Sequence, residues 1–120
     1  MSSKSILVIC RSAPYHSSAA RDALDIALSG AVFELPISLL LLDDAVLQLL
    51  PNQHSSAIGA KSVNAMLGAL PMYDIDKIYT SLGSLETHGL ALADLDPIPI
   101  ALDADELKTF IARHDVVLTL

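Results

Sequence analysis

Residues 39–50 read Leu-Leu-Leu-Leu-Asp-Asp-Ala-Val-Leu-Gln-Leu-Leu, an apolar run that stops at two carboxylates and then resumes at helical spacing. The first part is typical of a strand buried on both faces, and the second is typical of a short helix. Strands that pass into helices build α/β proteins, and ligands bind beyond the carboxyl ends of such strands. The stretch therefore predicts an α/β fold and marks its own junction as a candidate site.

The same alternation of strand and helix patterns runs through the rest of the chain. Strands are expected at residues 5–10, 36–42, 77–80, 98–101 and 116–118. Helices are expected at residues 18–30, 44–51, 56–71, 82–89 and 103–111. Right-handed crossovers between parallel strands place such helices on the faces of the sheet. We therefore expect a three-layer α/β/α sandwich around a five-stranded, mainly parallel, flavodoxin-like sheet.

Composition narrows the class of protein. A chain of 120 residues that is 52% apolar fits one compact domain, residues 1–120. The net charge of −7, with no cluster of Lys or Arg, disfavours direct binding of nucleic acid. The apolar run before Arg11 is too short for a signal peptide or a membrane span, and a lone cysteine suits a reducing compartment. We expect a cytoplasmic protein that does not bind membranes.

Local motifs for cofactors and metals are missing from the sequence. The five glycines form neither a Walker loop nor Gly-x-Gly-x-x-Gly, and Pro14 removes an N–H donor from the loop 11–18, where a flavodoxin-like protein would hold phosphate. The histidines lie more than 25 residues apart without a nearby cysteine: His16, His54, His88 and His114. We expect no bound cofactor and no metal, with a flavodoxin-like binder of a small ligand as an alternative.

Cys10 is the one candidate nucleophile. It ends the first strand beside Arg11 and close to a helix N-terminus, and both features favour a reactive thiolate. It also ends an Ile-Leu-Val-Ile-Cys run, and free cysteine is among the most buried residue types. The second interpretation is favoured, so a catalytic role for Cys10 is kept only as an alternative.

Asp43 and Asp44 also have two interpretations. They could act as general acid and base, or hold Mg²⁺. However, adjacent residues on an extended segment point in opposite directions, and a carboxylate at the start of a helix is favoured as its cap. Capping is the preferred prediction.

The short helix that follows is apolar around most of its circumference. Surface helices normally keep a polar face, so some of these side chains should be covered by another protein. The residues predicted to form this partner interface are Val46, Leu47, Leu49 and Leu50.

Three segments together resemble a known family. These segments are Arg11-Ser-Ala-Pro-Tyr-His16, Asp43-Asp-Ala-Val-Leu-Gln-Leu-Leu-Pro-Asn-Gln53 and Leu70-Pro-Met-Tyr-Asp-Ile-Asp76. They resemble the TusC/DsrF branch of the DsrE/DsrF-like sulfur-relay proteins, along nearly the whole chain. The resemblance implies a hetero-oligomer with TusB/DsrH-like and TusD/DsrE-like subunits that relays persulfide sulfur. In the TusBCD version the sulfur serves 2-thiolation of the tRNA wobble uridine, and in the DsrEFH version it serves sulfur oxidation.

The resemblance also implies which subunit carries the sulfur. In the TusD-like or DsrE-like sister subunit the reactive cysteine precedes an Arg-Gly-like pair that corresponds here to His88 and Gly89. Thr80 and Ser81 occupy that cysteine's position in this chain, and a hydroxyl group cannot carry a persulfide. The expectation is therefore a non-catalytic subunit of a TusBCD-like complex, with a DsrEFH-like subunit or a persulfide carrier acting through Cys10 as alternatives.

Overall fold

Five strands form one parallel sheet in the structure, a computed structural model that describes residues 4–12, 19–50, 67–75 and 77–120. The strands are β1 (Ile6–Cys10), β2 (Ile37–Leu41), β3 (Ile78–Ser81), β4 (Ile100–Leu102) and β5 (Val116–Thr119). Every pairing is parallel, in the order β4-β3-β2-β1-β5. The predicted fold class is confirmed. The strand order differs from the 2-1-3-4-5 order of flavodoxin. There the second strand forms the edge next to β1, whereas here β5 forms that edge.

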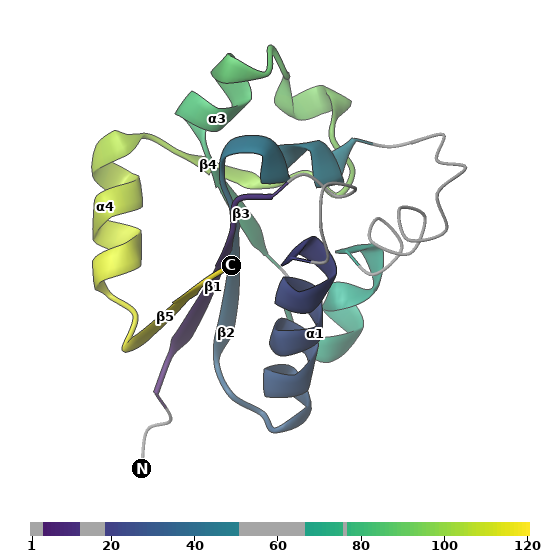
Figure 1. The fold of residues 1–120 in the computed structure, drawn as a ribbon, viewed down its shortest axis with the longest axis vertical. Coiled ribbons are helices and arrows are strands. Elements are labelled where there is room, and N and C mark those ends of the chain that lie inside the picture. Colours follow the sequence, from purple (N-terminus) through teal and green to yellow (C-terminus); the bar gives the residue numbers. More distant parts are fainter. Residues whose placement is uncertain (1–3, 13–18, 51–66, 76) are drawn as a thin grey trace.

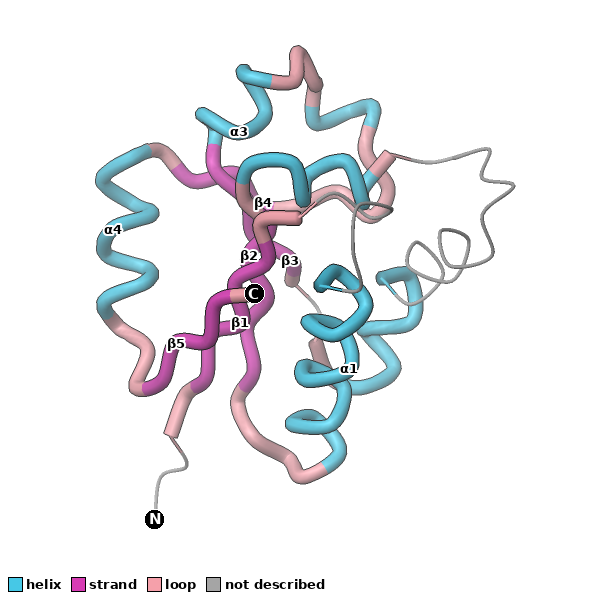
Figure 2. Tube along the Cα trace, viewed as in Figure 1, coloured by secondary structure: helices cyan, strands magenta, loops and turns pink. Residues whose placement is uncertain are grey.

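Helices cover the two faces of this sheet unequally. The α-helices are α1 (Ala19–Val32), α3 (Leu82–Thr87) and α4 (Ala104–Ala112), and the 3-10 helices are η1 (Asp43–Leu49), η2 (Leu70–Tyr73) and η3 (Leu92–Asp94). Figure 1 shows α1 on one side of the sheet and α4 on the other. The steps from β1 to β4 all run in one direction, whereas the step to β5 reverses, so α4 crosses on the opposite face. Figure 2 shows the strands as the middle layer between them.

Side chains that alternate along the strands build a hydrophobic core on each face. Val8 and Cys10 face α1, and Leu7 and Ile9 face α4. The core on the α1 side also takes in residues from the other elements on that face, among them Ala23, Leu24, Leu39, Leu41, Val46, Leu49, Leu70 and Leu85. The core on the α4 side consists of Leu7, Ile9, Leu40, Leu42, Leu102 and Phe110. Both faces of β1 and β2 are therefore buried, as their continuous apolar runs predicted.

The end of α1 differs from the prediction. The sequence places the end of this helix at Gly30, but the helix continues through the glycine to Val32. A Cβ atom at Gly30 would lie 2.6 Å from Cδ1 of Ile37, so the glycine lets the start of β2 approach the helix closely. The expected start of the helix at Ser18 and most of the expected helix 56–71 lie outside the described residues.

The start of α4 agrees with the prediction. The backbone N–H of Glu106 donates to Asp103 Oδ1 at 2.8 Å, and the backbone N–H of Asp103 donates to Glu106 Oε1 at 3.0 Å. This reciprocal pair is a capping box, which satisfies two N–H groups that the helix leaves without intrahelical partners. It fixes both carboxylates at the first turn of α4.

Candidate functional site

The carboxyl ends of β1, β2 and β3 meet at one edge of the sheet, where η1 and α3 follow directly on β2 and β3. In Figure 1 this edge lies at the top, with α3 and η1 above the strand ends. Asp43 has a positive φ of 53°, and its backbone N–H donates to Ser84 Oγ at 2.9 Å. Ser84 in turn hydrogen-bonds Ser81, with 2.7 Å between the two hydroxyl oxygens. The backbone turn at Asp43 is thus fastened to α3.

One ion pair and one imidazole–carboxylate contact flank this turn. Arg11 Nη1 lies 3.0 Å from Asp43 Oδ2, and His88 Nε2 lies 3.1 Å from Asp44 Oδ1. The Arg11 and Asp43 side chains are both more than half exposed, so this pair contributes at most about 1 kcal/mol. The second pair ties η1 to the end of α3. Both pairs join residues that lie far apart in the sequence.

These contacts correct the capping prediction for the two carboxylates. Leu42 is the N-cap residue of η1, and no side chain caps it. The Asp43 side chain contacts Arg11, whereas the Asp44 side chain contacts His88. Among the residues that the structure describes, no group of three His, Cys, Asp or Glu side chains could hold a metal ion. His16, His54 and the loop 13–18 lie outside those residues.

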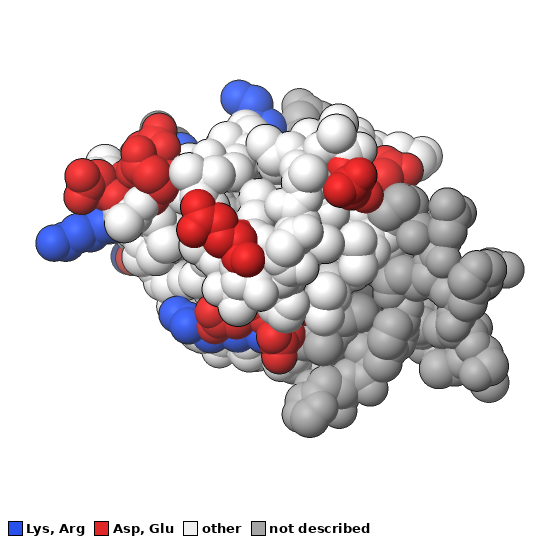
Figure 3. All heavy atoms as spheres, turned by 90° about the horizontal axis from the view of Figure 1, so that it is seen from above, with Lys and Arg blue, Asp and Glu red and all other residues white. Residues whose placement is uncertain are grey.

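A polar cavity of about 360 Å³ opens between η1 and α3. Its walls carry carboxylate, hydroxyl and imidazole groups, and its lining residues are Asp43, Asp44, Ser81, Gly83, Ser84, Thr87 and His88. Figure 3 views the molecule from this edge: in the described part of that face, charged side chains form separate small groups without a continuous basic patch. The described part of this face therefore lacks the positive surface that phosphate backbones require.

Cys10 lies beneath this edge and is fully buried. Gln48 Nε2 lies 3.5 Å from the Cys10 sulfur and donates to the carbonyl oxygen of Ser12 at 3.3 Å. The expectation that Cys10 packs as a small apolar residue is confirmed by its place in the core on the α1 side. A thiol in this position cannot meet a substrate or another protein while the core is closed.

We expect the Cys10 thiol to resist chemical modification in the folded protein. Reaction with a disulfide reagent such as Ellman's reagent requires local opening of the core, so the native rate should lie at least about a hundredfold below the rate in denaturant. Stopped-flow absorbance measures both rates on the same sample. Equal rates would show that the thiol is accessible, and Cys10 would then be a candidate sulfur carrier.

Thr80 and Ser81 stand at the end of β3. The Thr80 hydroxyl is buried and donates to the carbonyl oxygen of Leu41 at 2.6 Å. Ser81 caps α3, because its hydroxyl oxygen accepts from the backbone N–H of Ser84 at 3.0 Å. Both hydroxyl groups thus hold the chain in place, and Ser81 also lines the polar cavity.

The predicted partner interface is wrong for two of its four residues. Val46 and Leu49 are completely buried in the chain's own core, on the side of α1. The segment is a 3-10 helix, in which residues three apart share a face. Val46 and Leu49 therefore point inward together, whereas Asp44 and Leu47 share another face. Leu47 is half-buried, and Leu50, which directly follows the helix, is half-buried against the core on the α1 side. Leu47 and Leu50 remain the candidates for contact with another protein.

Gln48 and Ser84 are buried polar residues that sequence reasoning did not single out. The sequence does contain a hint for Gln48, because it is the one polar residue in the apolar run Ala-Val-Leu-Gln-Leu-Leu. No feature of the sequence points to Ser84, because its hydrogen bonds with Asp43 and Ser81 depend on how η1 and α3 pack.

The helices in the described part of the chain are too short or too polar to span a membrane.

The sequence and the fold both match known proteins. The profile of the DsrE/DsrF-like family matches residues 4–120. A protein of Pseudomonas aeruginosa named TusC homolog is 43% identical over 118 residues, which cover 98% of this chain and 99% of that protein. The intracellular sulfur oxidation protein DsrF of Allochromatium vinosum is 37% identical over 92 residues, covering 77% of this chain and 68% of that protein.

Solved structures support the same fold. The crystal structure of YchN from Escherichia coli superposes with a TM-score of 0.79 at 21% identity, over 98% of this chain and 99% of that one. The protein BT1422 of Bacteroides thetaiotaomicron superposes with a TM-score of 0.67 at 15% identity, over 96% and 94% of the two chains. From the profile match and the two relatives, we conclude that the chain belongs to the DsrE/DsrF-like sulfur-relay family, in the branch that contains TusC homologues and DsrF.

Proposed function

We propose that this chain is a non-catalytic subunit of a cytoplasmic, TusBCD-like sulfurtransferase complex. The complex relays persulfide sulfur for 2-thiolation of the tRNA wobble uridine, and this subunit shapes and supports the sulfur-carrying subunit. Family membership supports the sulfur-relay role, and the TusC homologue at 43% identity favours the tRNA branch of that role.

The observation that carries the non-catalytic assignment is the burial of the chain's single cysteine. A persulfide forms on a thiolate that a sulfur donor can reach, and Cys10 offers none while the protein is folded. The hydroxyl groups of Thr80 and Ser81 cannot take its place, and both already hydrogen-bond within the chain. In this proposal the reactive sulfur resides on another subunit.

The partners in this proposal are a TusB/DsrH-like and a TusD/DsrE-like subunit. Leu47 on η1 and Leu50 directly after it offer them an apolar contact, and the start of η1 borders the polar cavity. This position would place a partner's thiol close to the carboxyl ends of the strands, where α/β proteins commonly bind ligands. The decisive observation is what co-purifies with a tagged chain from its own cells. Absence of both partner subunits would refute the proposal.

Replacing Cys10 should leave sulfur transfer intact. In cells that carry Cys10→Ser or Cys10→Ala as the sole copy, we expect the 2-thiouridine content of tRNA, measured by mass spectrometry of nucleosides, to stay within about twofold of wild type. Two replacements are needed because a buried serine hydroxyl costs about 1–3 kcal/mol if it lacks a hydrogen bond, whereas alanine removes this cost. A cysteine-to-serine change in the TusD-like partner is the matched control and should abolish thiolation. Loss of thiolation in both Cys10 variants, with the complex intact, would identify Cys10 as a carrier.

Sulfur oxidation is the second candidate function, favoured by the 37% identity to DsrF. A strain that lacks this chain separates the two. Loss of tRNA 2-thiouridine supports the tRNA role, whereas normal tRNA with impaired oxidation of stored sulfur supports the DsrEFH-like role.

A further inference from the structure

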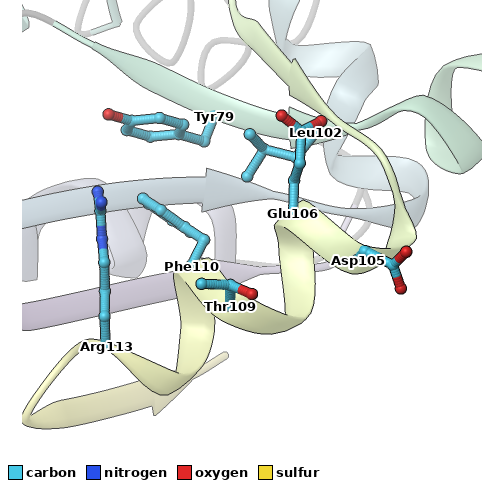
Figure 4. Close-up of a pocket in the computed structure, with 7 residues that line it drawn as sticks. All are labelled: Tyr79, Leu102, Asp105, Glu106, Thr109, Phe110 and Arg113. Carbon is cyan, nitrogen blue, oxygen red and sulfur yellow. The ribbon is translucent and has the colours of Figure 1, made fainter.

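A second hollow lies on the opposite face of the sheet, between α4 and the strands β3 and β4. Its volume is about 480 Å³, and Figure 4 shows the side chains that line it. The floor is apolar and consists of Tyr79, Leu102 and Phe110. Among the described helices only α4 covers this face, and Ile100 on the edge strand β4 is 40% exposed. The groove thus has room beside α4 and an apolar surface to cover.

Charges of opposite sign stand at the two ends of this groove. Asp105 and Glu106 lie in the first turn of α4, and Arg113 follows its last residue. The Arg113 guanidinium carbon lies 4.9 Å from the centroid of the Phe110 ring, and this cation–π contact keeps the positive charge at the groove. In Figure 4, Arg113 and Asp105 stand at opposite ends of α4 with Thr109 between them.

The spacing of these residues is symmetric about Thr109. Asp105 precedes it by four positions and Arg113 follows it by four, which corresponds to about 6 Å along the helix in each direction. Turning the helix end over end about Thr109 therefore exchanges the negative end for the positive end. A surface with this property is complementary to a copy of itself in the antiparallel direction, whereas a parallel copy would bring like charges together.

We propose that the groove accommodates α4 of a second copy of this chain, packed antiparallel across a twofold axis at Thr109. Asp105 of each copy then faces Arg113 of the other, twice in one interface. Thr109 is small and exposed, so the two helices can approach closely at the axis. Exposed charge pairs contribute little affinity, so they set the direction of packing while the apolar floor supplies most of the binding. The inference does not depend on the sulfur-relay proposal.

Charge reversal at the two ends tests this arrangement. Asp105→Arg places two like-charge repulsions against Arg113 in the dimer, and Arg113→Asp places two such repulsions against Asp105. We expect each variant alone to dimerise at least about tenfold more weakly than wild type in sedimentation equilibrium, because opposed like charges at an interface disfavour association. In an equimolar mixture of the two variants, the heterodimer carries one pair of introduced charges of opposite sign and one native Asp105–Arg113 pair. Native mass spectrometry should therefore show a heterodimer of near wild-type affinity.

A matched control is Arg21→Asp, which makes the same change of charge at an exposed position on α1, on the other face of the sheet. It should dimerise like wild type. Circular dichroism checks that the variants fold, and Asp105→Asn with Arg113→Gln replaces the reversals if one of them unfolds the chain. The neutral variants should each weaken dimerisation several-fold. A monomeric wild type at millimolar concentration, undiminished dimerisation of the variants, or a mixture no better than its components would overturn the proposal.

Discussion

Leu49→Asp is expected to prevent the chain from folding. The leucine side chain is completely inaccessible and packs within the core on the α1 side. The change removes most of an apolar side chain and leaves a carboxylate without a positively charged partner in the described part of that core. Together these effects exceed about 5 kcal/mol, which is the stability of many domains of this size. Circular dichroism and solubility after expression measure the outcome.

Leu49→Met is the control for this prediction. It keeps the volume and the apolar character of the side chain and should cost less than about 1.5 kcal/mol. A folded Leu49→Asp protein with a melting temperature near that of wild type would contradict the inward orientation of Leu49 in η1.

The double change Leu47→Asp with Leu50→Asp is expected to release the chain from its partner subunits while it stays folded. Both side chains are half-buried, Leu47 on η1 and Leu50 directly after it at the margin of the core on the α1 side, so the new carboxylates can reach water. If each leucine is a binding hot spot of about 2 kcal/mol, each change weakens association about thirtyfold. Co-purification with a tagged partner subunit, followed by quantitative mass spectrometry, measures the loss.

Ile26→Asp is the matched control, since Ile26 is a large apolar residue exposed on α1, away from η1. It should leave the complex intact. Full retention of the partners by the double variant would remove η1 from the interface. Together with Leu49→Asp, the double variant distinguishes two roles in this segment. Leu49 is expected to be required for folding, whereas Leu47 and Leu50 are expected to be required for assembly.

The order of strands and helices could be predicted from the sequence because each element carries its own local signal. The apolar runs Ile6–Cys10 and Ile37–Leu41 show their burial directly, and Asp103 with Glu106 indicates the start of α4. The strand order β4-β3-β2-β1-β5 carries no local signal, since it depends on which strands pair after the crossovers form. Fold class was therefore predictable, whereas the detailed topology was not.

The candidate site was predictable in place but not in its contacts. Asp43 and Asp44 marked the correct edge of the sheet, yet their partners Arg11 and His88 lie 32 and 44 residues away. The error at Val46 and Leu49 has a different cause. In an α-helix and a 3-10 helix alike, residues three apart share a face, so the local pattern does not show which face the chain's own core covers. The burial of both side chains depends on how η1 packs against the other elements on the α1 side.

The position of β1 between β2 and β5 also affects how the protein is made. β1 leaves the ribosome before the other four strands of the sheet, yet one of its edges is completed only by residues 116–119. Until β5 has emerged, the run Leu-Val-Ile keeps that edge without its final partner, and an open apolar edge can pair with other chains. The sheet can therefore be completed only after β5 has left the ribosome. Pairing of β5 with β1 thus removes an edge at which the new chain could aggregate.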